Sequence, residues 1–272
     1  MNSTPTIALI GTGNMGGAII QGLIAAGTSA DHLWASGPEV DQLNALHQKY
    51  GLHITSDNQA AARAADIIIL AIKPQIILSI AAELSGVMAE HQPLIISIAG
   101  GITEPVLRQA LGHPSPAIVR AMPNTPAMIG EGATALFANP FCSELHKQQA
   151  QSIFAAVGTT VWLEQEDLLY AVTALSGSGP AYFFLLLEAL EQAAAAMGLS
   201  PELAIPLIQQ TALGSAKMAL AKPHAVAQLR QAVTSPQGGT ERALNVLEAG
   251  GFRQLVQTAV EAARDRYIEL GH

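Results

Sequence analysis

Cysteine and charged residues are both scarce in this sequence of 272 residues. Cys142 is the only cysteine, which excludes an internal disulfide or a cysteine-based zinc site and is typical of a protein from the reducing cytoplasm. Charged residues make up 12% of the chain, the formal net charge is -8, and Lys and Arg form no run. This balance argues against nucleic acid or an anionic membrane as a partner, and it favours a small-molecule ligand.

Two further absences narrow the possible functions. The 8 histidines form no His-x-x-x-His pair and no His-Glu-x-x-His motif, so we predict no metal site. The apolar stretch from Phe183 to Met197 carries Glu188 and Glu191, so we predict no membrane span there. Half of the residues are hydrophobic, which is ample for the core of a globular protein.

The first part of the chain has the alternating strand and helix pattern of an α/β protein. From Thr6 to about Leu163, short apolar runs rich in β-branched residues alternate with alanine-rich segments of helical period. This alternation is typical of βαβ units, and it predicts an α/β domain with a parallel sheet over residues 1–163. We expect strands near 6–10, 33–35, 53–55, 67–71, 94–98, 118–121, 133–137 and 160–163. We expect helices near 15–26, 40–50, 59–64, 75–84, 104–111 and 143–157.

The second part of the chain has a different character. Strand-like runs almost vanish after Glu164, and long amphipathic segments continue to the C-terminus. We therefore expect an all-helical domain over residues 164–272, interrupted by glycine-rich breaks at 176–180, 234–239 and 250–251. Its helices are rich in Ala and Leu and leave more apolar surface than one thin bundle buries. We therefore expect this domain to form a homodimer that buries the remaining apolar surface.

A glycine-rich turn near the N-terminus predicts a dinucleotide site. Gly11-Thr12-Gly13-Asn14-Met15-Gly16 follows an expected strand directly and opens an expected helix, which is the context that gives a G-x-G-x-x-G match its meaning. Gly11 permits the tight turn, Gly13 lets a pyrophosphate approach the backbone, and Gly16 lets the helix pack on the strand. The positive end of the helix dipole then faces the phosphates.

The end of the second expected strand favours NADP over NAD. NAD sites usually carry Asp or Glu there to hold the ribose hydroxyls, whereas this chain has Ala35-Ser36-Gly37-Pro38. A 2′-phosphate would meet no repulsion, and Ser36 with backbone N–H groups can receive it. Lys73 closes the fourth expected strand on the edge where ligands bind, although a solvated lysine held extended by Pro74 explains it equally well.

Five motifs together resemble pyrroline-5-carboxylate reductase along nearly the whole chain. They are the glycine turn at 11–16, Ala71-Ile72-Lys73-Pro74, Met122-Pro123-Asn124-Thr125-Pro126, the 175–182 segment around Ser176-Gly177-Ser178-Gly179-Pro180, and Ser235-Pro236-Gln237-Gly238-Gly239-Thr240. The resemblance implies an NAD(P)-dependent oxidoreductase acting on a CH–NH bond, which reduces 1-pyrroline-5-carboxylate to L-proline in the last step of proline biosynthesis. It also implies a Rossmann-type NADP-binding domain followed by a helical dimerisation domain, with homodimers that assemble further into a ring such as a decamer.

The resemblance also assigns site residues by position. NADPH, with NADH as an alternative, would contact Gly11, Thr12, Gly13, Asn14, Met15, Ser36, Asn58, Ala71, Ile72, Lys73, Pro74, Ala99 and Gly100. The substrate would contact Glu166, Gly239 and Thr240, with Thr240 as the catalytic residue.

The chemistry of a cyclic imine fits the loop at Thr240. N–H groups at the start of the helix after Gly238 can receive the substrate carboxylate, and the Thr240 hydroxyl can donate to the imine nitrogen. An aliphatic hydroxyl is a weak acid, so we interpret Thr240 as an orienting donor. A plain helix N-cap is the alternative for Thr240, and a surface carboxylate at a helix start is the alternative for Glu166.

Two other functions compete with imine reduction. A β-hydroxyacid dehydrogenase also joins a dinucleotide domain to a helical one, but it places a lysine on the helix after its interdomain turn, and the run from Ala181 to Leu186 contains none. A protein that senses or binds NADP without turnover is the second alternative. Oxidation of NADPH on addition of pyrroline-5-carboxylate would separate these possibilities.

Overall fold

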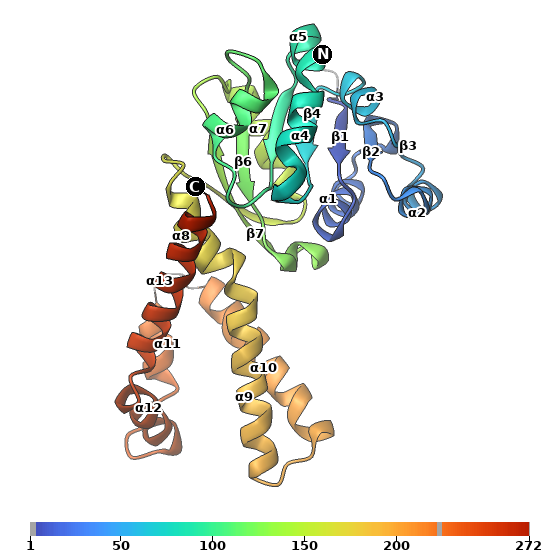
Figure 1. The fold of residues 1–272 in the computed structure, drawn as a ribbon. Coiled ribbons are helices and arrows are strands. Elements are labelled where there is room, and N and C mark those ends of the chain that lie inside the picture. The colour runs from blue at the N-terminus through green and yellow to red at the C-terminus, as the bar shows by residue number, and fades with distance from the viewer. Residues whose placement is uncertain (1–3, 222–224, 272) are drawn as a thin grey trace. The chain divides into compact units, whose positions relative to one another are not determined.

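The computed structural model describes residues 4–221 and 225–271, so positions 1–3, 222–224 and 272 of the two expected domains lie outside the described residues. Its single sheet has eight strands in the order β3-β2-β1-β4-β5-β6-β7-β8, which contains the 3-2-1-4-5-6 order of a Rossmann fold (Figure 1). The strands are β1 Ile7–Ile10, β2 Leu33–Ser36, β3 His53–Thr55, β4 Ile67–Leu70, β5 Leu94–Ser97, β6 Ile118–Met122, β7 Gly132–Ala138 and β8 Gly158–Trp162.

The expectation of a parallel sheet holds for β1 to β6 and is wrong at β7. This strand pairs with β6 in antiparallel fashion, with Val119 opposite Ala138 and Met122 opposite Ala135. The connection from β6 to β7 holds only the 3₁₀ turn η2, Thr125–Ile129, and is too short for the crossover that returns a chain to a parallel position. Because β8 pairs with β7 in parallel, both strands run opposite to the Rossmann strands.

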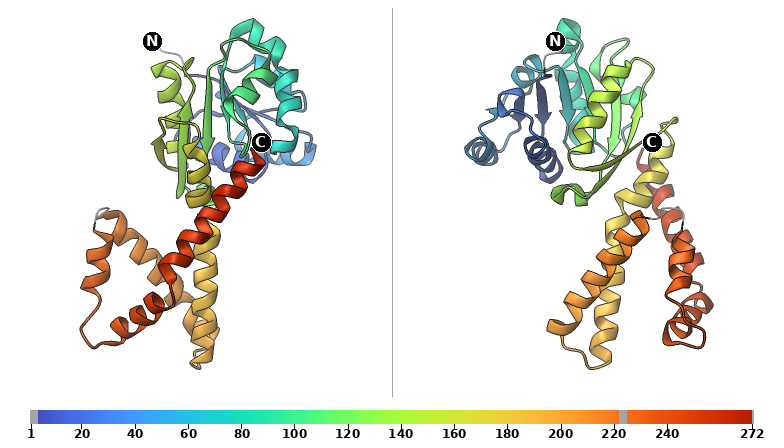
Figure 2. Two further views of the ribbon diagram at one scale, coloured as in Figure 1. Left: turned by 60° about the vertical axis from the view of Figure 1, so that its left-hand side comes forward. Right: turned by 180° about the vertical axis from the view of Figure 1, so that it is seen from behind.

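Helices cover both faces of the sheet, and alternate strand residues pack under them. One apolar cluster joins Ile7, Leu9 and other strand residues to α1, α2 and α7, and a second joins Ala8, Ile10 and their neighbours to α3, α4, α5 and α6. Figure 2 shows α7 on the opposite side of the sheet from α4 to α6. These helices are α1 Asn14–Ala25, α2 Val40–Tyr50, α3 Asn58–Arg63, α4 Pro74–Glu83, α5 Ser85–His91, α6 Glu104–Leu111 and α7 Glu144–Ala155.

All eight strands and six helices expected in the first part of the chain are present, within a few residues at their ends. Helix α5 is not among the expected helices, and Ser85-Gly86, directly after α4, has the composition of a break. Leu84 keeps right-handed helical dihedrals, so a second helix follows the first at once. It ends at His91, and the C-cap residue Gln92 adopts the left-handed region with φ 51°.

The rest of the chain is helical, as expected. Its helices are α8 Leu168–Val172, the π-helical turn η3 Thr173–Gly177, α9 Gly179–Ala196, α10 Pro201–Ala221, α11 Val226–Ala232, α12 Gly239–Ala249 and α13 Phe252–Leu270. The described residues form two compact units. The first holds the sheet up to Ser178 together with the end of α13 from Ala263, and the second holds 179–262.

The second unit leaves most of its large apolar side chains uncovered. Helix α9 exposes 70% of Phe183, 61% of Phe184 and 66% of Leu185. Helix α10 does the same with Leu203, Leu207 and other residues, and only Gly179, Ala194 and Ala204 of the described residues in α9 and α10 are buried. Because such surface is costly in water, the unit has the composition of an interface rather than of a finished bundle.

The length and hydropathy of the helices can also be compared with those of a membrane-spanning helix. Among the described residues, one helical stretch, Leu168–Ala196, is long and apolar enough to span a bilayer, and 22% of its most apolar window is buried. A single stretch of this kind is weak evidence, because core helices meet the same criterion.

The dinucleotide edge and the helical-domain loop

The glycine turn has the geometry that its sequence predicts. Gly11 has φ 98°, in the left-handed region, and its N–H donates to the Ser36 carbonyl at 2.8 Å. A methyl group on Gly11 would collide with the Ala71 carbonyl, and one on Gly16 would collide with the Gly11 carbonyl. Both glycines therefore serve the close packing of β1, α1 and the β4 end.

Gly13 differs from its two neighbours in the motif. It has φ -61°, which any residue adopts, and a methyl group placed on it would meet nothing within 4 Å. It is the N-cap of α1, and no side-chain bond caps that helix. The open space and the uncapped N–H groups form a cradle that suits an anionic group such as a pyrophosphate.

The ends of β2 and β3 bring two predicted cofactor residues together. Ser36 is fully buried, and its hydroxyl donates to Asn58 Oδ1 at 2.6 Å. Asn58 begins α3, whose N-cap Asp57 accepts bonds from the backbone of the first turn. The Ser36 bond fixes the Asn58 side chain, and the Asn58 amide N–H₂ donates to no group in the part of the chain that the structure describes. It can therefore donate to a ribose or phosphate oxygen.

Two further strand ends complete this edge of the sheet. Ala71 N donates to the Ile10 carbonyl at 2.8 Å, which holds the β4 end beside the glycine turn. Lys73 is exposed, extended and the N-cap of α4, with Pro74 as the first helical residue. Gly100 follows β5, and a methyl group placed on it would lie 3.8 Å from the Met122 methyl group, in ordinary contact. All thirteen predicted cofactor residues thus lie at or directly after the carboxyl ends of five neighbouring strands, β3, β2, β1, β4 and β5.

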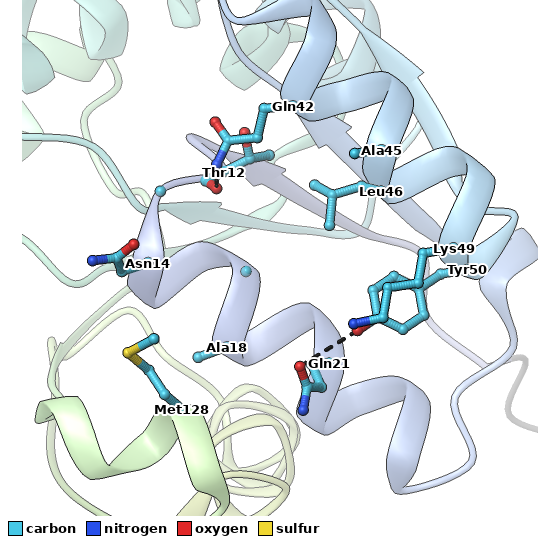
Figure 3. A pocket seen from close by; sticks show the side chains of 12 residues that line it. Thr12, Asn14, Ala18, Gln21, Gln42, Ala45, Leu46, Lys49, Tyr50 and Met128 are labelled. Atoms are coloured by element: carbon cyan, nitrogen blue, oxygen red, sulfur yellow. Dashed lines mark hydrogen bonds between the residues drawn. The ribbon is translucent and has the colours of Figure 1, made fainter.

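A groove of about 310 Å³ lies beside the glycine turn, between α1, α2 and η2 (Figure 3). Thr12, Gly13 and Asn14 line one end of it, and Lys49 and Tyr50 line the other. Gln42 Nε2 donates to the Thr12 carbonyl at 2.5 Å and so supports the turn from this side. None of the predicted cofactor residues beyond the turn lines the groove, so it flanks the dinucleotide edge and is not the main part of it.

Asn124 has a role that the sequence pattern did not assign. Its Oδ1 accepts from Ala133 N at 2.8 Å, and its Nδ2 donates to the Ser176 carbonyl at 3.1 Å. These bonds join the loop after β6 to β7 and to the π-helical turn η3. The motif at 122–126 is therefore rigid because of a side-chain amide as well as its two prolines.

The predicted substrate residue Glu166 sits in an ion pair. Its Oε1 accepts from Arg120 Nη1 at 2.7 Å and from Glu104 N, the first N–H of α6, at 2.5 Å. The side chain of Arg120 is 5% exposed and that of Glu166 is 18% exposed. Arg120 was not among the predicted site residues, because it lies inside a short apolar strand and belongs to no sequence motif that would indicate a function.

The loop before α12 carries the other two predicted substrate residues. Gln237 has φ 60°, and its N–H donates to Glu241 Oε2 at 2.8 Å, which folds the loop back on the helix start. No side-chain bond caps α12, so the Thr240 hydroxyl does not act as its N-cap. Gly239 and Thr240 are exposed at the first turn of α12, in the second unit.

The remaining chemically reactive groups add no second site. No group of three His, Cys, Asp or Glu able to hold a metal occurs among residues 4–221 and 225–271. Burial raises the pKa of Cys142 to about 11, so its thiol is protonated at neutral pH and is a poor nucleophile.

A Rossmann sheet with a glycine turn at its carboxyl edge, followed by a helical unit, defines the class of NAD(P)-dependent oxidoreductases. Family models match both parts. Residues 6–101 match the NADP oxidoreductase, coenzyme F420-dependent family, and residues 166–270 match pyrroline-5-carboxylate reductase dimerisation.

Whole proteins give the same result. The chain is 44% identical over 268 residues to the pyrroline-5-carboxylate reductase of Pseudomonas aeruginosa, covering 98% of this chain and 97% of that one. A solved pyrroline-5-carboxylate reductase of Coxiella burnetii is 45% identical, with a TM-score of 0.95 over 99% and 100% of the two chains. The Plasmodium falciparum enzyme, solved with NADP bound, is 32% identical with a TM-score of 0.87 over 99% of each chain. The chain belongs to the pyrroline-5-carboxylate reductase family.

Proposed function

We propose that this protein reduces 1-pyrroline-5-carboxylate to L-proline with NADPH, the last step of proline biosynthesis, with NADH as an alternative cofactor. The observation that carries this proposal is family membership over the full chain together with an intact dinucleotide edge. When bound, NADPH supplies the hydride for the imine carbon. Binding, orientation and protonation of the substrate fall to side chains and backbone groups of the protein.

The preference for NADPH rests on the end of β2. A buried serine, whose hydroxyl donates to Asn58 Oδ1, and the amide of Asn58 stand where NAD-specific sites carry a carboxylate, so a 2′-phosphate meets the Asn58 N–H₂ group and no negative charge. The bound NADP of the Plasmodium falciparum relative supports the same preference. The thirteen residues assigned to the cofactor all lie at or directly after strand ends at this edge.

Substrate recognition is assigned to the first turn of α12 and to Glu166. The uncapped N–H groups of Gly239 and Thr240 suit the substrate carboxylate, and the exposed Thr240 hydroxyl suits the ring nitrogen. Because Glu241 already ties the loop to the helix, Thr240 is not needed as a cap. This supports an orienting role for Thr240, with water or the substrate iminium as the proton source.

Assembly and location complete the proposal. The uncovered apolar side chains of the second unit support a homodimer through the helical part, which fits the dimerisation family at 166–270. We propose a division into domains at 1–163 and 164–272, further assembly of dimers into a ring such as a decamer, and a cytoplasmic location.

A turnover assay with matched variants tests the proposal. The purified protein should oxidise NADPH on addition of pyrroline-5-carboxylate and form proline in equal amount. Thr240→Ala should lower kcat/KM about 10- to 100-fold with the oligomer intact, while Thr211→Ala, an exposed hydroxyl whose bond goes to its own helix, should leave it unchanged. Binding of NADPH without turnover would instead identify an NADP-binding protein and reject the proposal.

A further inference from the structure

Arg120, Glu166 and the start of α6 form a single buried cluster. Arg120 lies on β6, Glu166 lies in the turn between β8 and α8, and both meet at one oxygen, Glu166 Oε1, which also accepts from Glu104 N. Thr103, the N-cap of α6, makes no side-chain cap bond, so Glu166 replaces it from 62 positions along the chain. The cluster therefore joins the consecutive elements α6 and β6 to a turn that is distant in sequence.

The second oxygen of Glu166 remains available. Oε1 takes both donors, and Oε2 has no hydrogen-bond partner within residues 4–221 and 225–271. Arg120 has lost water almost completely, and its Nε makes no bond to any described residue. Since a buried guanidinium is costly unless it is paired, the pair is a poor way to gain stability alone.

Strand order places this cluster next to the β5 end of the predicted cofactor edge. The predicted cofactor residues follow β3, β2, β1, β4 and β5 in spatial order, from the ribose residues at β2 to Gly100 after β5. β6, which carries Arg120, is the next strand beyond β5. Helix α6, whose first N–H binds Glu166, begins only four residues after Gly100.

We infer that Arg120 is a positioning residue for the imine reduction proposed above. It holds Glu166 Oε1 so that Oε2 is presented as a fixed acceptor for the ring N–H of pyrroline-5-carboxylate in its protonated, cationic form. The Thr240 hydroxyl then donates to the same nitrogen once hydride transfer to the carbon has given that nitrogen a lone pair. The Glu166 carboxylate favours that cation, and Arg120 with the α6 N–H prevents it from rotating away. This inference rests on the proposed function and adds a residue outside the recognised motifs.

Four variants test the inference in the full-length protein. Glu166→Gln and Arg120→Met should each lower kcat/KM for pyrroline-5-carboxylate by about tenfold or more, chiefly through a higher KM, because the acceptor is lost or unfixed. Arg120→Lys should recover part of that loss. The double variant Arg120→Met with Glu166→Gln should be within about threefold of Glu166→Gln alone, since residues acting as one unit are not additive.

One further readout and one control variant separate positioning from structural support. The NADPH dissociation constant, measured by fluorescence, should change less than about twofold in all four variants, because none of their side chains is assigned to the cofactor. The double variant removes both charges and can therefore fold where a single variant does not. Arg63→Met, which breaks the exposed pair with Glu90, is the matched control and should behave as wild type.

The outcomes distinguish this inference from the proposed function. A folded double variant with wild-type kcat/KM would mean that the pair is structural and would overturn the inference, while the wild-type activity stands. Single effects that multiply in the double variant would overturn it too, because the two residues would then act independently. A wild-type protein that does not reduce the imine at all would reject the proposed function itself.

Discussion

Replacing Gly11 or Gly13 by alanine should damage the protein in two different ways. Gly11 has φ 98°, and a methyl group there would collide with the Ala71 carbonyl and lie 2.6 Å from Ile72 Cγ2. Gly13 has an ordinary φ of -61° and nothing within 4 Å of the position of a methyl group. Gly11→Ala should therefore destabilise the fold, whereas Gly13→Ala should leave it intact and obstruct the cofactor.

The sizes of the two effects follow from these geometries. A left-handed alanine costs about 1–2 kcal/mol, and overpacking against a rigid backbone costs about 1–3 kcal/mol more. A loss of roughly 2–5 kcal/mol in a domain of this size corresponds to a fall in Tm of about 5–15 °C. For Gly13→Ala we expect an unchanged Tm and an NADPH dissociation constant raised by about tenfold or more, or about 1.4 kcal/mol.

Thermal unfolding without cofactor and NADPH fluorescence titration measure the two quantities separately. Gly86→Ala is the matched control, since Gly86 lies in the exposed part of α5 with open space around it, and it should raise Tm slightly. Equal falls in Tm for Gly11→Ala and Gly13→Ala, with NADPH affinity unchanged in the second, would refute the assignment of Gly13 to the pyrophosphate.

Three other predictions concern the rest of the chain. Phe183→Glu should dissociate the oligomer in size-exclusion chromatography because Phe183 is 70% exposed on α9, while Phe141→Glu on the first unit should not; an intact oligomer would place the interface elsewhere. Gln237→Gly should raise the unfolding free energy by about 1 kcal/mol by relieving the left-handed conformation, and a lower Tm would contradict this. Burial raises the pKa of Cys142 to about 11, so at pH 8 a thiol reagent should react far more slowly with the folded protein than with the urea-unfolded protein, whereas equal rates would refute the burial.

Local patterns alone determined most of the fold and the cofactor edge. Hydrophobic alternation and helical period gave the eight strands and six of the seven helices of the first part, because both signals depend only on which faces of an element are buried. The glycine turn was predictable for the same reason. Gly11 and Gly16 are required by the backbone conformation and the close packing of the strand and helix that they connect, so their spacing is visible in the sequence.

Only the tertiary structure decided which distant residues meet. The direction of β7 depends on the length of the connection from β6, which holds a 3₁₀ turn that no hydrophobic periodicity indicates. The alternating pattern of the sequence predicted a parallel strand instead. The pairing of Arg120 with Glu166 spans 46 positions, and the capping of α6 by Glu166 spans 62. Such contacts arise when separate elements pack around a common point, so the physical interaction that fixes these side chains leaves no local pattern in the chain.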